Sequence, residues 1–282
     1  MKKLITLIVL LLPFLNIFAQ EGKLKSVQGI SLWAPANVKV DGNLKEWDDT
    51  FQAYNKTTKL FYSVSNDDKY IYLVVKSIDI PNNAKIIAGG ITLTINTEGK
   101  KKDKGAYSLT FPVIEKATRQ RGAGGRGGIG RQPGVAPDSA AIAAQHKKTV
   151  ESSKEIKVSG FKDITDTLIS IYNEYSIKAA IGYDAIGNYD YEAAIPLKLL
   201  NVSADSPKEI AYNIKINGLQ MPAGFGGFGG ADGGGGGFGG GGRGGAGGGG
   251  NRGGGNITPG GRNDPEMYSP TDFWGRYILA TK

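Results

Sequence analysis

Apolar and polar residues alternate with a period of two in several short segments of this chain. The alternation is clearest in residues 210–217, where Ile210, Tyr212, Ile214 and Ile216 fall on one side and Asn213, Lys215 and Asn217 on the other. Because successive side chains of a strand point to opposite faces of a sheet, this pattern predicts a half-buried strand. Residues 91–96, 107–111 and 189–195 alternate in the same way. Several such strands separated by turn residues predict an all-β fold, an antiparallel β-sandwich of the immunoglobulin-like or jelly-roll type.

Two glycine-rich segments interrupt this pattern. The chain has 282 residues and 44 Gly, and more than half of these Gly lie between residues 224 and 261. Glycine-rich chain loses much entropy on ordering and has few side chains to bury, so we expect disordered insertions at 116–154 and 222–264 in a single domain over 27–282. The ends of the second insertion can lie close in space, since the cost of closing a loop grows slowly with its length. In the first insertion, the Ala-rich residues 138–150 predict a short helix capped by Asp138 or Ser139.

In residues 1–19, charged, apolar and small-residue regions follow one another in the order that is typical of a secretory signal peptide. Two lysines precede an apolar run from Leu4 to Leu15, and a cleavage-site pattern ends at Ala19. The run is short for a membrane span, and no later segment is apolar enough to cross one. We therefore expect a secreted, exported protein, periplasmic or extracellular, without a transmembrane segment after removal of the signal. The chain has no Cys, which excludes disulfides and zinc–thiolate sites.

The basic surplus of the chain is unevenly distributed. The formal net charge is +8, and loss of Lys2 and Lys3 with the signal lowers it by two to +6. A basic surface attracts nucleic acid, anionic glycans or membranes, but the clusters at 100–104 and 119–131 favour solvated loops. Segments 121–128 and 242–245 resemble the Arg-Gly segments that bind RNA. Export separates the protein from RNA, so we expect no nucleic-acid partner.

Residues 38–47 contain a short β-prone segment, then an Asp-Gly turn, and then a polar segment that ends in Trp47. Gly42 after Asp41 suits a backbone position with positive φ. Trp47 is large and amphipathic, which favours a structural position at the edge of the core. Residues 60–64 and 70–75 are β-rich and flank an Asn-Asp-Asp turn, which predicts a hairpin.

The order Asp-Gly-x-x-x-Glu-Trp, followed by this hairpin and Tyr-Ile-Tyr-Leu, resembles the start of family-nine carbohydrate-binding modules and of the wider DOMON-like β-sandwich domains. Residues 191–197, Tyr-Glu-Ala-Ala-Ile-Pro-Leu, resemble the strand of that family that ends in Ile-Pro-Leu. The resemblance covers most of residues 38–220 and the end of the chain from Phe273. It implies a β-sandwich, a carbohydrate ligand and a possible calcium ion. These motifs are signatures of the fold more than of the site, so they say little about the ligand.

The sequence favours no catalytic or metal centre. His146 is the only His and lies in the Ala-rich part of the first insertion, away from any partner that would form a catalytic triad. Paired carboxylates support glycoside hydrolysis, but a chain with 26 Asp and Glu contains many such pairs. We interpret Asp41, Asp67 and Asp68 as turn residues, and no EF-hand spacing is present. We therefore expect no enzyme activity, with glycoside hydrolysis as the remaining alternative because carboxylates are plentiful, no haem and no assigned metal ligands.

A sugar site needs aromatic faces and fixed polar groups in a concave surface. In the family, the Trp residues that stack on sugar come from loops; one such position is occupied here by Ile86-Ile87-Ala88-Gly89-Gly90, and another by the second glycine-rich insertion. We expect Trp274 to be packed in a closing strand. The remaining candidates for sugar contact are Phe225, Phe228 and Phe238. The leading hypothesis is an exported, non-catalytic carbohydrate-binding module whose partner is a polysaccharide or a cell-envelope component. The alternative is an envelope structural or protein-interaction domain that keeps the fold without a sugar site.

Overall fold

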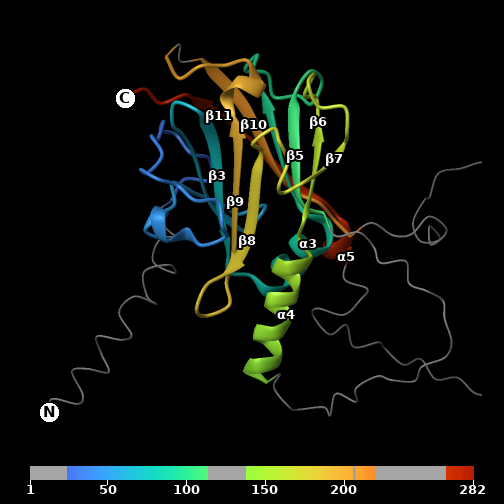
Figure 1. The fold of residues 1–282 in the computed structure, drawn as a ribbon. Helices are drawn as coiled ribbons and strands as arrows, with labels where there is room; N and C mark the ends of the chain where they lie inside the picture. The colour runs from blue at the N-terminus through green and yellow to red at the C-terminus, as the bar shows by residue number, and fades with distance from the viewer. Residues whose placement is uncertain (1–23, 114–137, 206–207, 220–264) are drawn as a thin grey trace, which may run out of the picture.

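A computed structural model describes residues 24–113, 138–205, 208–219 and 265–282 (Figure 1). Two antiparallel sheets pack face to face, which confirms the predicted all-β sandwich. The expected signal peptide, most of the two glycine-rich segments and the candidates Phe225, Phe228 and Phe238 lie outside the described residues.

The first sheet has five strands in the order β1-β2-β3-β9-β8. The predicted hairpin is present: β2 and β3 pair antiparallel around Asp67 and Asp68, and Asp67 Oδ1 accepts hydrogen bonds from the backbone N–H groups of Lys69 and Tyr70. The bounds of the five strands are β1 (Ala53–Asn55), β2 (Leu60–Asn66), β3 (Tyr70–Ser77), β9 (Tyr189–Pro196) and β8 (Lys178–Tyr183).

The second sheet has six strands in the order β11-β10-β4-β5-β6-β7. All its pairs are antiparallel, and the segment with the clearest alternation, β10, lies between β11 and β4. The bounds are β11 (Thr271–Ile278), β10 (Glu209–Ile216), β4 (Ile91–Asn96), β5 (Tyr107–Val113), β6 (Glu155–Ser159) and β7 (Leu168–Ser170).

The main core lies between the two sheets. Ile210, Tyr212, Ile214 and Ile216 of β10 all lie in this core, as their alternation predicts. Tyr62 of β2 and Tyr212 meet across it with their hydroxyl oxygens 3.1 Å apart, so each satisfies a polar group of the other inside an apolar interior. The tyrosine pair links β2 of the five-stranded sheet to β10 of the six-stranded sheet.

A smaller core covers the opposite face of the five-stranded sheet. The segment before β1 runs over β2 and β3 and places Leu44, Trp47 and Phe51 on them. Every residue of β2 is buried as a result, because one face meets the six-stranded sheet and the other meets this segment. Trp47, at the end of the 3₁₀ helix η1 (Leu44–Trp47), is 6% exposed, which confirms its predicted position in the core.

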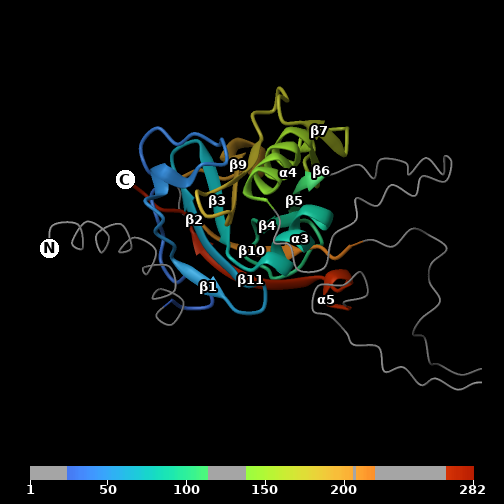
Figure 2. The ribbon, with the colours of Figure 1, turned by 90° about the horizontal axis from the view of Figure 1, so that it is seen from below.

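Three helices lie toward one end of the sandwich (Figures 1 and 2). The helix α3 (Ile80–Gly89) contains most of the segment Ile86–Gly90, and the side chain of Asp79 caps it by accepting a hydrogen bond from Asn82 N. The predicted Ala-rich helix is α4 (Ser139–Ser152), within the segment 116–154 that we expect to be disordered, and Asp138 caps it. The short helix α5 (Pro265–Tyr268) contacts α3, and the 3₁₀ helix η2 (Leu197–Leu200) follows β9.

The described residues on either side of the second glycine-rich segment meet. Leu219 N donates a hydrogen bond of 2.7 Å to Met267 O, so the residues on either side of 220–264 are joined through their backbones. This contact agrees with the expectation that the ends of that segment lie close in space.

In the described part of the chain, no helix combines the length and the apolar composition needed to cross a membrane.

Candidate functional site

The outer face of the six-stranded sheet carries a row of polar side chains. Strand register places them side by side, because Asn213 of β10 is opposite both Trp274 of β11 and Thr94 of β4, and Thr94 is opposite Ser108 of β5. A parallel row on the same face joins Asp272, Lys215, Thr92 and Thr110. Apart from Thr110, the residues of these rows line a groove of about 410 Å³, and Asp103, Ala106, Ser159 and Asn217 line it as well.

Trp274 is the aromatic side chain of this groove. Its neighbours Phe273 and Gly275 are opposite the core residues Ile214 and Tyr212, so the alternation of β11 turns Trp274 to the outer face. Trp274 is half-buried and lines the groove. The expectation that it packs inside the closing strand therefore needs correction: the side chain stands on the surface of the sheet.

Hydrogen bonds fix the polar groups beside Trp274. Asn213 Nδ2 donates to Asp272 Oδ2 at 2.7 Å and to the Phe273 carbonyl oxygen at 2.9 Å. At the far side, the hydroxyl oxygens of Thr92 and Thr110 are 2.7 Å apart. Lys215 lies between Asp272 and Thr92 in the strand register and has no ion pair among the described residues. The groove thus presents a carboxylate held by Asn213 and an ammonium group without an ion pair near an indole ring.

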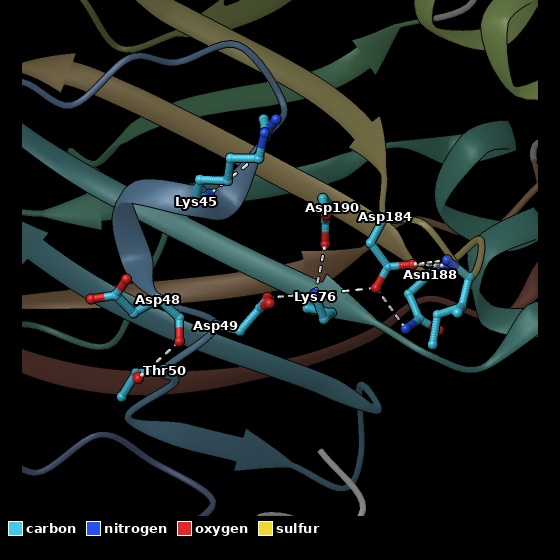
Figure 3. Close-up of polar contacts among 10 residues, drawn as sticks. Lys45, Asp48, Asp49, Thr50, Lys76, Asp184, Asn188 and Asp190 are labelled. Carbon is cyan, nitrogen blue, oxygen red and sulfur yellow. Dashed lines mark hydrogen bonds and ion pairs between the residues drawn. The ribbon is translucent and has the colours of Figure 1, made fainter. Parts of the chain in front are cut away.

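A second hollow, of about 500 Å³, holds a cluster of charged side chains (Figure 3). Lys76 is the only charged residue of β3 and is buried. Its Nζ lies 2.6 Å from Asp49 Oδ1, 3.2 Å from Asp184 Oδ2 and 3.6 Å from Asp190 Oδ1. Asn188 orients Asp184, since its backbone N–H and its side-chain amide both donate to that carboxylate at 2.8 Å.

The surroundings of the cluster shift the pKa of two of its members. Burial is the largest single influence on Lys76 and lowers its pKa, but the carboxylates around it outweigh that effect, so the net pKa is raised. Burial raises the pKa of Asp190 to about 7 against the opposing effect of Lys76. The Asp190 side chain is only 5% exposed and its Oδ1 accepts no hydrogen bond, so its charge is poorly stabilised.

The charged cluster acts as a structural tie. It joins the segment before β1, through Asp49, to β3 and to the turn between β8 and β9. The ammonium group of Lys76 occupies the position between the carboxylates that a bound metal cation would otherwise take. Within the residues that the structure describes, no three His, Asp or Glu side chains are grouped so that they could hold a metal ion.

Glu192 of β9 explains why the segment 38–47 adopts its conformation. This buried carboxylate accepts hydrogen bonds from Trp47 Nε1 at 2.9 Å, from Gly42 N at 2.8 Å and from Asp41 N at 3.0 Å. Gly42 has a φ of +84°, as predicted, and Asp41 Oδ1 accepts from Asn43 N, which confirms its role as a turn residue. Burial raises the pKa of Glu192, and the three donors oppose that rise. Asp41, Gly42 and Trp47 therefore form a structural unit held by one acidic side chain.

His146 lies on α4 and stacks on Tyr183 of β8. The ring centroids are 3.6 Å apart and the planes differ by 1°. Burial lowers the pKa of His146, which favours the neutral imidazole in this stack. The contact fastens α4 to the five-stranded sheet.

Sequence reasoning missed both hollows, although each had a signal. Lys76 is a single charge inside an otherwise uncharged strand, which is typical of a buried ion pair. Trp274 lies one position from Phe273 in a strand, so one of these two aromatic side chains had to face outward.

Comparison of the chain with models of protein families, with curated proteins and with solved structures finds no match. The resemblance to family-nine carbohydrate-binding modules and DOMON-like domains stays a prediction from the motifs.

Proposed function

We propose that this protein is a non-catalytic carbohydrate-binding module and that the groove beside Trp274 holds the sugar. The observation that supports this proposal is the combination of an indole ring with fixed polar side chains on one open sheet face. Sugars present apolar C–H faces that pack on aromatic rings and hydroxyl groups that need directed hydrogen bonds. Trp274 offers the first kind of contact, and Asp272 and Lys215 offer the second.

We propose binding without hydrolysis. A glycosidase needs one carboxyl group whose pKa is raised by apolar surroundings so that it acts as the general acid. The two carboxylates that line the groove, Asp103 and Asp272, are both exposed, and Asp272 is hydrogen-bonded by Asn213. These features favour hydrogen bonding to sugar hydroxyls over proton transfer.

The proposal also places the protein outside the cytoplasm, in the periplasm or the extracellular space, with a polysaccharide or a cell-envelope component as its partner. The support for this location is the order of charged, apolar and small residues in Met1–Ala19. N-terminal sequencing of the protein from native cells should begin near Gln20, whereas a cytoplasmic protein that keeps Met1 would contradict export.

A glycan array followed by calorimetry tests the function. We expect binding of at least one neutral glycan, lost on Trp274→Ala and largely kept on Trp274→Phe, because phenylalanine retains an aromatic face. Asp272→Asn should weaken binding by about tenfold through the loss of a charge-assisted hydrogen bond. The double variant Phe225→Ala/Phe228→Ala changes none of the described residues that line the groove, and on this proposal it should bind as the wild type does.

Two outcomes would redirect this proposal. If Phe225→Ala/Phe228→Ala abolishes binding while Trp274→Ala does not, the sugar is held by the second glycine-rich segment. If the folded wild type binds no glycan, the envelope interaction domain becomes the better description of the protein.

A further inference from the structure

A third hollow lies where the edge of the five-stranded sheet meets the end of α4. It measures about 520 Å³, and its apolar wall is formed by Val40, Val150, Ile171 and Ala180. These residues come from the segment before η1, from α4, from the chain after β7 and from β8. Phe111 of β5 also lines the hollow, so five separate parts of the fold build it, and it is distinct from the groove beside Trp274.

Two lysines that line this hollow lie over tyrosine rings. Lys154 Nζ lies 6.0 Å from the ring centroid of Tyr172, which also lines the hollow, and Lys178 Nζ lies 5.4 Å from that of Tyr70, which does not. Tyr172 is 80% exposed, which is unusual for a large aromatic side chain in a folded domain. Each pair combines a cation with an aromatic face, and the ring attracts the ammonium group that lies over it.

The hollow carries an excess of positive charge. Lys39, Lys154 and Lys178 all line it and all are exposed, and none of them has an ion pair within the described ranges. The only carboxylate in its wall is Asp41, whose Oδ1 accepts a hydrogen bond from Asn43 N. Three like charges around one hollow repel one another, and an anion placed among them would relieve that repulsion.

We propose that this hollow binds a carboxylated polysaccharide, a chain of uronic acid residues. The lysines supply the charge complement of the carboxylates, and Tyr172 supplies an exposed face for a sugar ring. A polymer fits better than a small anion, because the cationic groups are spread over three segments of the chain. We favour a polysaccharide over a nucleic acid because Met1–Ala19 predicts export. This site is independent of the sugar groove and stands even if that groove binds nothing.

Affinity for polygalacturonate tests this site. The triple variant Lys39→Gln/Lys154→Gln/Lys178→Gln should lose about tenfold in affinity at physiological salt. The control variant Lys102→Gln/Lys104→Gln/Lys162→Gln removes the same charge from exposed lysines away from the hollow and should bind nearly as the wild type does. Tyr172→Ala should weaken binding by several-fold, because it removes the exposed aromatic face of the hollow. Melting curves confirm that each variant is folded.

Fully methyl-esterified polygalacturonate has the same backbone without the charge and should bind the wild type far more weakly. Three results would overturn the proposal: no binding of polygalacturonate, equal losses in the two triple variants, or equal binding of the esterified polymer. Tighter binding of single-stranded nucleic acid than of polygalacturonate, lost in the first triple variant, would reassign the hollow to a different polyanion.

Discussion

Glu192 shows how one buried side chain organises a segment that is remote in sequence. The carboxylate holds the backbone of the Asp41-Gly42 turn and the indole of Trp47 at the same time. A buried carboxylate is costly unless its oxygens are satisfied, so these three donors and the acid stabilise each other. The turn, the indole and the acid form a single energetic unit.

Trp47→Ala should lower the free energy of unfolding by roughly 3–5 kcal/mol, because it removes a buried ring and leaves Glu192 without one donor. Trp47→Phe should cost less, since it keeps most of the apolar contact and loses only the hydrogen bond. Urea denaturation measures both. Trp274→Ala is the matched control on the outer face of the sheet, and a loss as large as that of Trp47→Ala would contradict this assignment of roles.

Asp190 makes the folded protein less stable as the pH rises, which is the reverse of the usual effect of a carboxyl group whose pKa is lowered by folding. Its pKa rises from 3.8 to about 7 on folding. The folded state therefore holds a proton that the unfolded state has lost between these pH values, and stability falls as pH rises through this window. The contribution of Asp190 to the free energy of unfolding is fully present below the unfolded pKa and is lost as the pH rises through about 7. The shift of its pKa corresponds to a contribution of roughly 4 kcal/mol.

Asp190→Asn should flatten the decline of stability between about pH 4 and pH 7, because Asn has no proton to lose. Lys76 keeps Asp49 and Asp184 as partners in this variant. Urea denaturation across this pH range measures the slope. Asp68→Asn makes the same change of charge in an exposed turn, and its stability curve should run parallel to that of the wild type. Parallel curves for Asp190→Asn and the wild type would refute the assignment.

At the scale of elements, the Asp41-Gly42 turn packs directly on the backbone of β8. A Cβ at Gly42 would overlap the carbonyl oxygen of Ile181, and Gly182 is similarly close to the backbone of Gly42. No side chain fits between these two segments. The turn therefore depends on glycine for its contact with β8 as well as for its positive φ.

A comparison of Gly42→Ala with Gly105→Ala separates the effect of the positive φ from the effect of the close contact with β8. Gly105 also has a positive φ, of +76°, but a Cβ there would meet nothing within 4 Å. Gly105→Ala should cost about 1 kcal/mol of stability from backbone strain alone, whereas Gly42→Ala should cost clearly more. Thermal denaturation of both variants checks the difference, and equal losses would show that the contact with β8 yields easily.

The strands were more predictable from sequence than the two hollows. Alternation identified β10, β4 and β9 because each presents at least one face to the core, and the turn residues identified the β2–β3 hairpin. Helix α3 was not predicted, since the segment Ile86–Gly90 was compared only with the position of a sugar-stacking Trp in the family and not tested for helical periodicity. Lys76 and Asp190 are far apart in sequence, and only the pairing of β3 with β9 places them opposite each other. The hollow at Tyr172 depends on the position of α4, which no periodic pattern fixes.

At the scale of the whole molecule, we expect the sandwich to be stable without the second glycine-rich segment. The described residues alone build the main core and the core under Trp47. Replacing residues 224–261 by a short Gly-Ser linker should therefore change the melting temperature by no more than about 3 °C. A larger loss in differential scanning calorimetry would show that this segment packs against the domain.

The hydrogen bond between Leu219 N and Met267 O brings together the described residues that flank 220–264. Because the described chain stops and resumes at one place, we expect insertions and deletions within 220–264 to leave the pairing of β10 with β11 unchanged. Evolution can then vary the length of this segment without changing the sandwich. For the protein engineer, the same point is a place where a reporter, an epitope or a second binding domain can be spliced into the chain.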